Sequence, residues 1–253
     1  MKIALLEQDN KTIKKAVVSC PGILFLNASD MPSACEMLSG GKVDAVVAGI
    51  DITTRDMVLA CKENLEKTHK YFSSCFVMEK AGQTIVVADA GVCKNPNVEM
   101  MKEIVLETYE TAKAVLNDEP RIAMLSFSSF GSGGADSSID KILEVINSIK
   151  AERPEIMIDG EMQLDVAICP EVAMKKAPDS IVAGNANVLI CPDLNSGNIL
   201  YKSMERYGGF TAAGPILQGF NGLVSDLSRG STVEDVILVF RTLEKLYSKR
   251  NMI

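Results

Sequence analysis

Histidine is almost absent from this sequence. His69, in the polar run EKTHKYF, is the only histidine among 253 residues. A Ser-His-Asp or Cys-His mechanism would have a single histidine to use, so general base catalysis is expected to fall to a carboxylate. We expect His69 itself to lie at the surface, because the residues around it are polar or charged.

Paired cysteines are lacking too. The seven cysteines form no CxxC motif, and several lie in apolar runs such as VAICPEV and VLICPDL. We therefore expect buried free thiols in a reducing compartment and no metal site.

Long apolar runs and basic stretches are also missing. No run reaches the length of a membrane span, and MKIALLEQDN holds only five apolar residues before charge returns, unlike a signal peptide. The net charge of −7 argues against nucleic acid as the main partner. We expect a cytoplasmic protein that binds neither a membrane nor nucleic acid.

Short apolar runs alternate with amphipathic ones along the chain. This alternation, with strands rich in valine, predicts an α/β fold with a largely parallel sheet. The expected strands cover 1–7, 22–28, 43–50, a hairpin over 71–91, 121–129 and 186–194. The expected helices cover 9–20, 31–41, 53–69, 96–116, 137–154, 196–209 and 236–249.

The glycine-rich segment 214–235, GPILQGFNGLVSDLSRGSTVED, is expected to be rich in loops. Ser231 or Thr232 can cap the helix that follows, and a helix start with a nearby arginine suits an anion. The alternatives are that Asp235 only complements the helix dipole and that Arg229 only forms a surface salt bridge. The segment gathers a compact set of reactive groups, which are Asp226, Ser228, Arg229, Thr232 and Asp235.

A second candidate is the loop SFSSFGSGGADSS at 126–138, between a strand and a helix. Ligands of α/β sheets bind at such strand ends, although neither a Walker A motif nor GxGxxG is present. The alternative is a flexible connecting loop. The predicted substrate-binding groups here are Ser126, Ser128, Ser129, Gly131 and Ser132.

Two further runs carry polar groups. Asp193, Asn195 and Asn198 follow a buried strand, and they either bind substrate or form an Asx-turn that caps the next helix. The run DGEMQLD at 159–165 holds three carboxylates, and a polar turn is favoured over a catalytic or metal-binding role.

Taken in order, these motifs resemble the phosphate acetyl/butyryl transferase family. The similar segments are RIAMLSFSSFGS, DGEMQLDVAICPEVAMKKAPDS, VAGNANVLICPDLNSGN, GPILQGFNGLVSDLSRG and VED, with a weaker similarity in VDAVVAGIDITTRD. The resemblance implies an isocitrate/isopropylmalate-dehydrogenase-like fold of two α/β domains with a cleft. Domain 1 would combine residues 1–66 and 211–253, and domain 2 would cover 67–210.

The resemblance also implies a homodimer that exchanges an acyl group, acetyl by default, between coenzyme A and inorganic phosphate. Coenzyme A, acyl-CoA, acyl phosphate and phosphate would be its partners, with no permanently bound cofactor and no metal. Asp235 would take the thiol proton, Arg229 would hold the phosphoryl group, and Ser228 would hydrogen-bond to the reacting centre. Gln218 and Gly230, in the same segments, are further predicted substrate-binding residues.

The sequence departs from the family pattern in its basic residues. Family members are typically longer, and the missing length is N-terminal. A family arginine falls on Leu59, a histidine on Ile52 and a lysine on Phe130, while Arg55 could compensate for the arginine. The alternatives are therefore a catalytically impaired homologue that binds coenzyme A or acyl-CoA or acts structurally, and a phosphate butyryltransferase. A nucleotide-dependent dehydrogenase lacks its motifs here.

Overall fold

The computed structural model describes residues 1–250 of the 253-residue chain. Its strands are β1 (Lys2–Leu5), β2 (Leu24–Asn27), β3 (Ala45–Ala48), β4 (Ser73–Lys80), β5 (Gln83–Ala88), β6 (Arg121–Leu125), β7 (Met157–Met162), β8 (Val188–Ile190), β9 (Thr211–Gln218) and β10 (Leu223–Asp226). Its helices are α1 (Lys11–Val18), α2 (Met31–Ser39), α3 (Thr54–Asn64), α4 (Val98–Val115), α5 (Ser137–Glu152), α6 (Leu164–Ile168), α7 (Pro170–Lys176), α8 (Leu194–Arg206) and α9 (Val233–Arg250).

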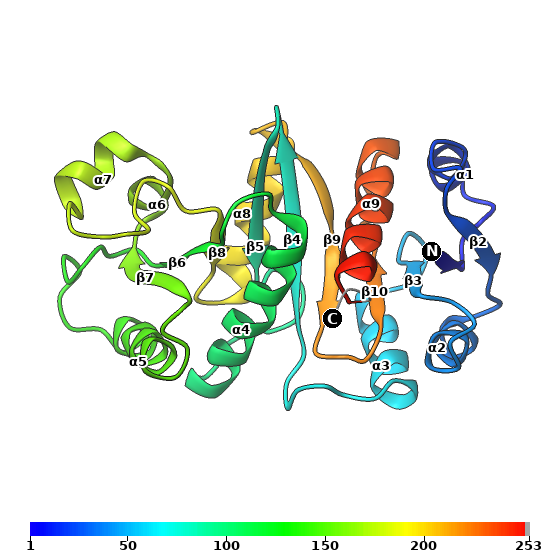
Figure 1. The fold of residues 1–253 in the computed structure, drawn as a ribbon, viewed down its shortest axis with the longest axis horizontal. Helices are drawn as coiled ribbons and strands as arrows, with labels where there is room; N and C mark the ends of the chain where they lie inside the picture. Colours follow the sequence, from blue (N-terminus) through cyan, green and yellow to red (C-terminus); the bar gives the residue numbers. More distant parts are fainter. Residues whose placement is uncertain (251–253) are drawn as a thin grey trace.

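All these strands belong to one sheet, in the order β2-β1-β3-β10-β9-β4-β5-β8-β6-β7. At one end β2, β1, β3 and β10 are parallel, and at the other β5, β8, β6 and β7 are parallel. Antiparallel pairs β10–β9, β9–β4 and β4–β5 join the two ends. Figure 1 shows the resulting two halves with β4 and β9 between them.

Both ends of the chain contribute to the first half, because β10 pairs with β3. Residues 67–210 supply most of the second half. The sheet is hydrogen-bonded throughout, so the domain boundaries at 66/67 and 210/211 stay predictions.

Helices cover both faces of the sheet and bury its apolar side chains. On one face, residues of α1, α9, α4 and α5 form a single core with β1, β3, β5, β6 and β8. On the other face, α2 and α3 pack on the first half, and α6 and α8 pack on the second half. Burial of this kind is the main force that stabilises a folded chain.

The structure confirms the α/β class and most predicted elements, with three corrections. Segment 214–235 is not mainly loop, because it holds most of β9 and all of β10. The run 159–165 is not a turn: it lies in β7 and the start of α6. The helix predicted over 53–69 ends at Asn64.

The cysteines fit the expectation of free thiols. All seven are unpaired, and only Cys169 among them is partly exposed. Across residues 1–250, no helix is both long and apolar enough to cross a bilayer.

Candidate active site

A cavity of about 540 Å³ lies where the two halves of the sheet meet. Asp226 at the end of β10 pairs in parallel with Ala48 at the end of β3, so the loops after these strands are neighbours. Strand carboxyl ends are the usual place for ligands in α/β sheets. The polar and charged lining residues are Thr53, Thr54, Arg55, Asp226, Ser228 and Arg229 from the first half, with Asn198, Tyr201 and Lys202 from α8.

Asp226 is the buried carboxylate of this cavity, with 2% of its surface exposed. Its Oδ2 accepts a hydrogen bond from Thr54 Oγ1, whereas Oδ1 has no hydrogen-bond partner. Burial raises the pKa of the Asp226 carboxyl to about 7; the Thr54 hydrogen bond opposes this rise, and the negative charge of Glu7 adds to it. A carboxyl of this kind can exchange protons near neutral pH.

Ser228 and Arg229, two and three residues after Asp226, line the same cavity. The Ser228 hydroxyl accepts a hydrogen bond from the Gly230 N–H at 3.4 Å, and the Gly230 carbonyl accepts one from Arg206. Arg55, the residue expected to compensate for a missing family arginine, lines this cavity as well. The cavity therefore holds three cationic side chains, because Lys202 joins the two arginines.

Asp235 lies outside the cavity lining, in the first turn of α9. Its Oδ2 accepts hydrogen bonds from Thr232 N–H at 2.7 Å and Thr232 Oγ1 at 2.8 Å, and its Oδ1 accepts one from Ala212 N–H at 2.8 Å. The Asp235 N–H donates back to Thr232 Oγ1 at 3.1 Å, which completes a capping box. In this conformation both oxygens of Asp235 are used to hold the helix start.

The serine-rich loop is folded onto the buried Glu161 of β7 and does not line the cavity. Glu161 Oε1 accepts hydrogen bonds from Ser128 Oγ at 2.7 Å and from the Gly131 N–H at 2.8 Å. Ser132 Oγ accepts from the Ser129 N–H, and Ser126 Oγ from the Ser128 N–H. These groups satisfy one another, so substrate binding by this loop stays a prediction.

The polar residues after β8 have different positions and contacts. Asp193 caps α8, accepting hydrogen bonds from Ser196 N–H at 2.8 Å and Ser196 Oγ at 2.7 Å, which is the Asx-type alternative. Asn198 lines the cavity, whereas Asn195 is exposed outside it. Sequence reasoning missed Tyr201 and Lys202; the i,i+4 spacing of Asn198 and Lys202 on one helix face could have indicated Lys202.

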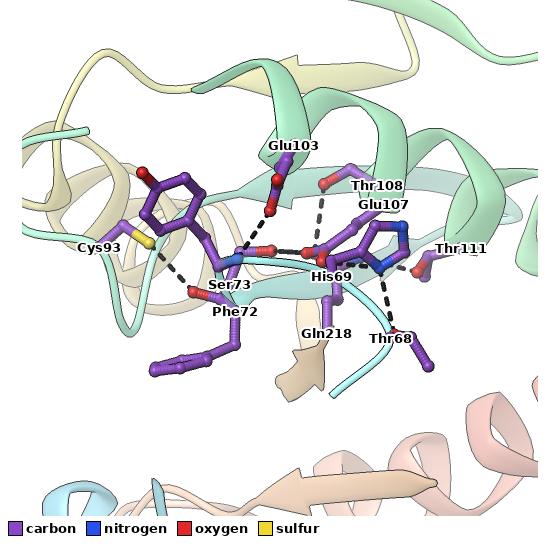
Figure 2. A network of polar contacts seen from close by, with 11 residues as sticks. Thr68, His69, Phe72, Ser73, Cys93, Glu103, Glu107, Thr108, Thr111 and Gln218 are labelled. Carbon is purple, nitrogen blue, oxygen red and sulfur yellow. Dashed lines mark hydrogen bonds and ion pairs between the residues drawn. The ribbon is translucent and has the colours of Figure 1, made fainter. Parts of the chain in front are cut away.

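Gln218 lies on the other side of the sheet, in a buried polar network with Glu107 (Figure 2). Its Oε1 accepts a hydrogen bond from Ser73 and its Nε2 donates one to Thr111, and Gln218 does not line the cavity described above. His69 Nδ1 is 3.3 Å from Glu107 Oε1, and the histidine side chain is 46% exposed, which confirms the expected surface position. Burial raises the pKa of the Glu107 carboxyl to about 7.

The chain belongs to the phosphate acetyl/butyryl transferase family, whose model matches residues 12–241. It is 43% identical over 202 residues to a phosphate acetyltransferase of Bacillus subtilis, an alignment that covers 78% of this chain and 61% of the relative. The chain thus spans about three fifths of the length of that relative.

Solved structures show the same fold. A phosphotransacetylase from Streptococcus pyogenes superposes with a TM-score of 0.85 at 29% identity, over 98% of this chain and 94% of that one. A 4-hydroxythreonine-4-phosphate dehydrogenase from Klebsiella pneumoniae gives a TM-score of 0.56 at 12% identity, over 97% and 90%. The latter likeness concerns the fold alone, and it agrees with the predicted dehydrogenase-like α/β architecture.

Proposed function

We propose that this protein exchanges an acetyl or other short acyl group between coenzyme A and inorganic phosphate. The observation that carries the proposal is one cavity that brings Ser228, Arg229, Arg55 and Lys202 to a buried carboxyl, Asp226. Relatives named phosphate acetyltransferase support the choice of reaction.

The cations suit the phosphate part of this chemistry. Arg229 is proposed to hold the phosphoryl group, because a guanidinium fits phosphate oxygens with two parallel hydrogen bonds. Arg55 and Lys202 would stabilise the negative charge that develops on the reacting group. Ser228 would donate a hydrogen bond to the reacting centre. Coenzyme A is a substrate here, and no permanently bound cofactor or metal is proposed.

The family resemblance assigns the proton acceptor for the thiol to Asp235. In that role, Asp235 would first have to release the Thr232 hydrogen bonds. Asp235→Asn should then lower turnover far more than coenzyme A affinity. Equal effects on turnover and affinity would argue against this role.

A thiol-release assay tests the proposed reaction. Acetyl-, propionyl- and butyryl-CoA are each supplied with phosphate, and free coenzyme A is detected as thiol. Turnover with acetyl-CoA is expected, and faster turnover with butyryl-CoA would select the butyryltransferase alternative. Absence of turnover with all three donors, from protein that melts cooperatively, would reject the proposal.

The second candidate is an acyl-CoA-binding protein without catalysis. Leu59, Ile52 and Phe130, which stand where basic residues are expected, favour it. Calorimetry with coenzyme A and acetyl phosphate separates the two functions, because binding without turnover selects the second. We propose a homodimer located in the cytoplasm in either case; sedimentation at several concentrations tests the assembly.

A further inference from the structure

A second cavity, of about 300 Å³, lies between α4, α9 and the end of β9, on the face of the sheet that these two helices cover. We propose that it binds a small carboxylic acid with an apolar body, whose carboxylate is held by cations of α9. The binding does not depend on the proposed acyl exchange. The two cavities share no lining residue, so a ligand here would leave the candidate active site open.

Apolar side chains form much of the wall of this second cavity. Helix α4 contributes Leu106 and Ala114, which are only half-buried although they pack against the core. Leu246 of α9 faces the cavity as well, and Ile216 and Leu217 of β9 line it from the sheet. A cavity of this size, lined by apolar groups with a few polar ones among them, is typical of sites for small molecules.

The α9 side of the cavity combines an apolar residue with two cations. Leu246, Lys249 and Arg250 lie three and four residues apart, so they share one face of the helix. No carboxylate among residues 1–250 pairs with Lys249 or Arg250. Both cations can therefore hold the carboxylate of a ligand whose apolar body lies against Leu246.

The two carboxyl groups that line this cavity, both on α4, already have partners. Glu107 is buried; its Oε2 accepts a hydrogen bond from Ser73, and its Oε1 lies 3.3 Å from His69 Nδ1 (Figure 2). Glu110 Oε1 lies 3.7 Å from a guanidinium nitrogen of Arg153, a third cation of the cavity. Because the carboxyls are engaged, the charge left for a ligand is positive, and an anion is favoured over an amine.

The lining defines the chemical class of the ligand. A free phosphate ion would leave the apolar walls in contact with water, and a neutral hydrocarbon would leave the cations unused. A carboxylate matches the guanidinium of Arg250 and the ammonium of Lys249, while an apolar chain covers the leucines. Hexanoate is a suitable probe, because its eight heavy atoms need roughly 240 Å³ when each takes about the volume of a water molecule.

Calorimetry with sodium hexanoate tests the site. Hexanoate should bind the wild type at a single site with a Kd on the order of 1 mM, as expected for so small a ligand. Hexanamide has the same apolar body without the charge, and it should bind about 5-fold more weakly. Saturation with coenzyme A should leave the hexanoate affinity unchanged, because the cavities share no lining residue.

Two kinds of variant locate the bound probe. Ala114→Leu fills the cavity from α4 and should abolish measurable hexanoate binding, while the rate of acyl exchange stays that of the wild type. Ala151→Leu makes the same change at an exposed position of α5 and is its control.

The second variant combines Lys249→Gln with Arg250→Gln. It should weaken hexanoate binding about 10-fold and leave hexanamide binding unchanged, because only hexanoate carries a charge. Lys11→Gln combined with Lys15→Gln removes two positive charges from exposed positions of α1 and should bind hexanoate as the wild type does.

The outcomes separate this site from the proposed acyl exchange. A wild type that binds hexanoate but exchanges no acyl group would refute the exchange and support the site. Absence of hexanoate binding, its displacement by coenzyme A, or full binding by Ala114→Leu would overturn the site. Should Ala114→Leu not fold, the variant of the two α9 cations decides, and an unchanged preference for hexanoate over hexanamide in that variant rejects the proposal.

Discussion

Thr54, the first residue of α3, donates a hydrogen bond from its Oγ1 to Oδ2 of Asp226, 172 residues further along the chain. This contact joins the start of α3, the helix that follows β3, to the end of β10. It also stabilises the charged form of a carboxylate that burial would otherwise neutralise. Thr54 is thus a positioning residue for Asp226.

Replacing Thr54 by valine removes this hydrogen bond while keeping the branched shape. The pKa of Asp226 should rise, because the Thr54 bond is the contribution that lowers it. The free energy of unfolding should therefore keep falling to a higher pH than in wild type, because the folded protein retains the Asp226 proton longer. Thr54→Ser keeps the hydroxyl and should resemble wild type. Urea unfolding at several pH values checks this, and a loss of stability that is the same at every pH would contradict the prediction.

Glu7→Gln should shift the same pH dependence of stability in the opposite direction. The Glu7 charge raises the Asp226 pKa, so with glutamine at this position the fall in stability should end at a lower pH. Glutamine retains an oxygen that can accept from the Gly49 and Asp51 N–H groups, as Glu7 Oε1 does at 3.1 and 2.9 Å. Asp9→Asn, two residues away and exposed, is the matched control. Parallel shifts in Glu7→Gln and Thr54→Val would show that Asp226 is not the titrating group.

Gly49→Ala should damage both stability and activity. A Cβ would lie 2.1 Å from Asp226 Oδ1 and 2.5 Å from Leu227 N, and the backbone φ of +119° is unfavourable for alanine. Overpacking of this kind typically costs about 1–3 kcal/mol. Gly22→Ala is the control, because no heavy atom lies within 4 Å of its Cβ. Urea unfolding checks the pair, and equal small effects would contradict the prediction.

The sequence predicted the elements well, and the predicted Arg55, Ser228 and Arg229 do line the cavity. It did not predict the burial of Asp226 or the contacts of the serine-rich loop, because these depend on residues far away in the chain. Apolar runs such as VDAVVAGI are visible locally, because burial selects Val and Ala over a few residues. The burial of Asp226 depends on β3, whose residues lie more than 170 positions earlier. The hydrogen bonds made by the serine-rich loop likewise depend on Glu161 of β7, a partner that a local sequence pattern cannot identify.

The prediction that segment 214–235 is rich in loops failed for a specific reason. Gly214 and Pro215 resemble turn residues, yet they lie inside β9, opposite a register shift between Cys75 and Val77 of β4. Glycine and proline are tolerated in a strand at such an irregularity. Composition alone does not distinguish this arrangement from a loop, whereas the capping of α9 by Thr232 was predictable from local spacing.

The buried Glu107 offers a stability test that is independent of catalysis. Its Oε2 accepts a hydrogen bond from Ser73, and its Oε1 lies 3.3 Å from Nδ1 of His69, while burial raises its pKa from 4.5 to about 7 (Figure 2). The favourable contribution of the protonated form is complete below the unfolded pKa near 4.5. This contribution is lost as the pH rises through about 7. Between the two pKa values, the unfolded chain releases the proton that the folded chain retains.

Glu107→Gln should therefore become more stable than wild type as the pH rises. The difference in free energy of unfolding should be small near pH 5 and grow to about 3 kcal/mol by pH 8, since each pKa unit corresponds to about 1.4 kcal/mol. Glu110→Gln is the control on the same helix, because the Glu110 side chain is 60% exposed. Urea unfolding at several pH values gives both curves. A Glu107→Gln difference that stays constant with pH would mean that Glu107 keeps its ordinary pKa in the folded protein.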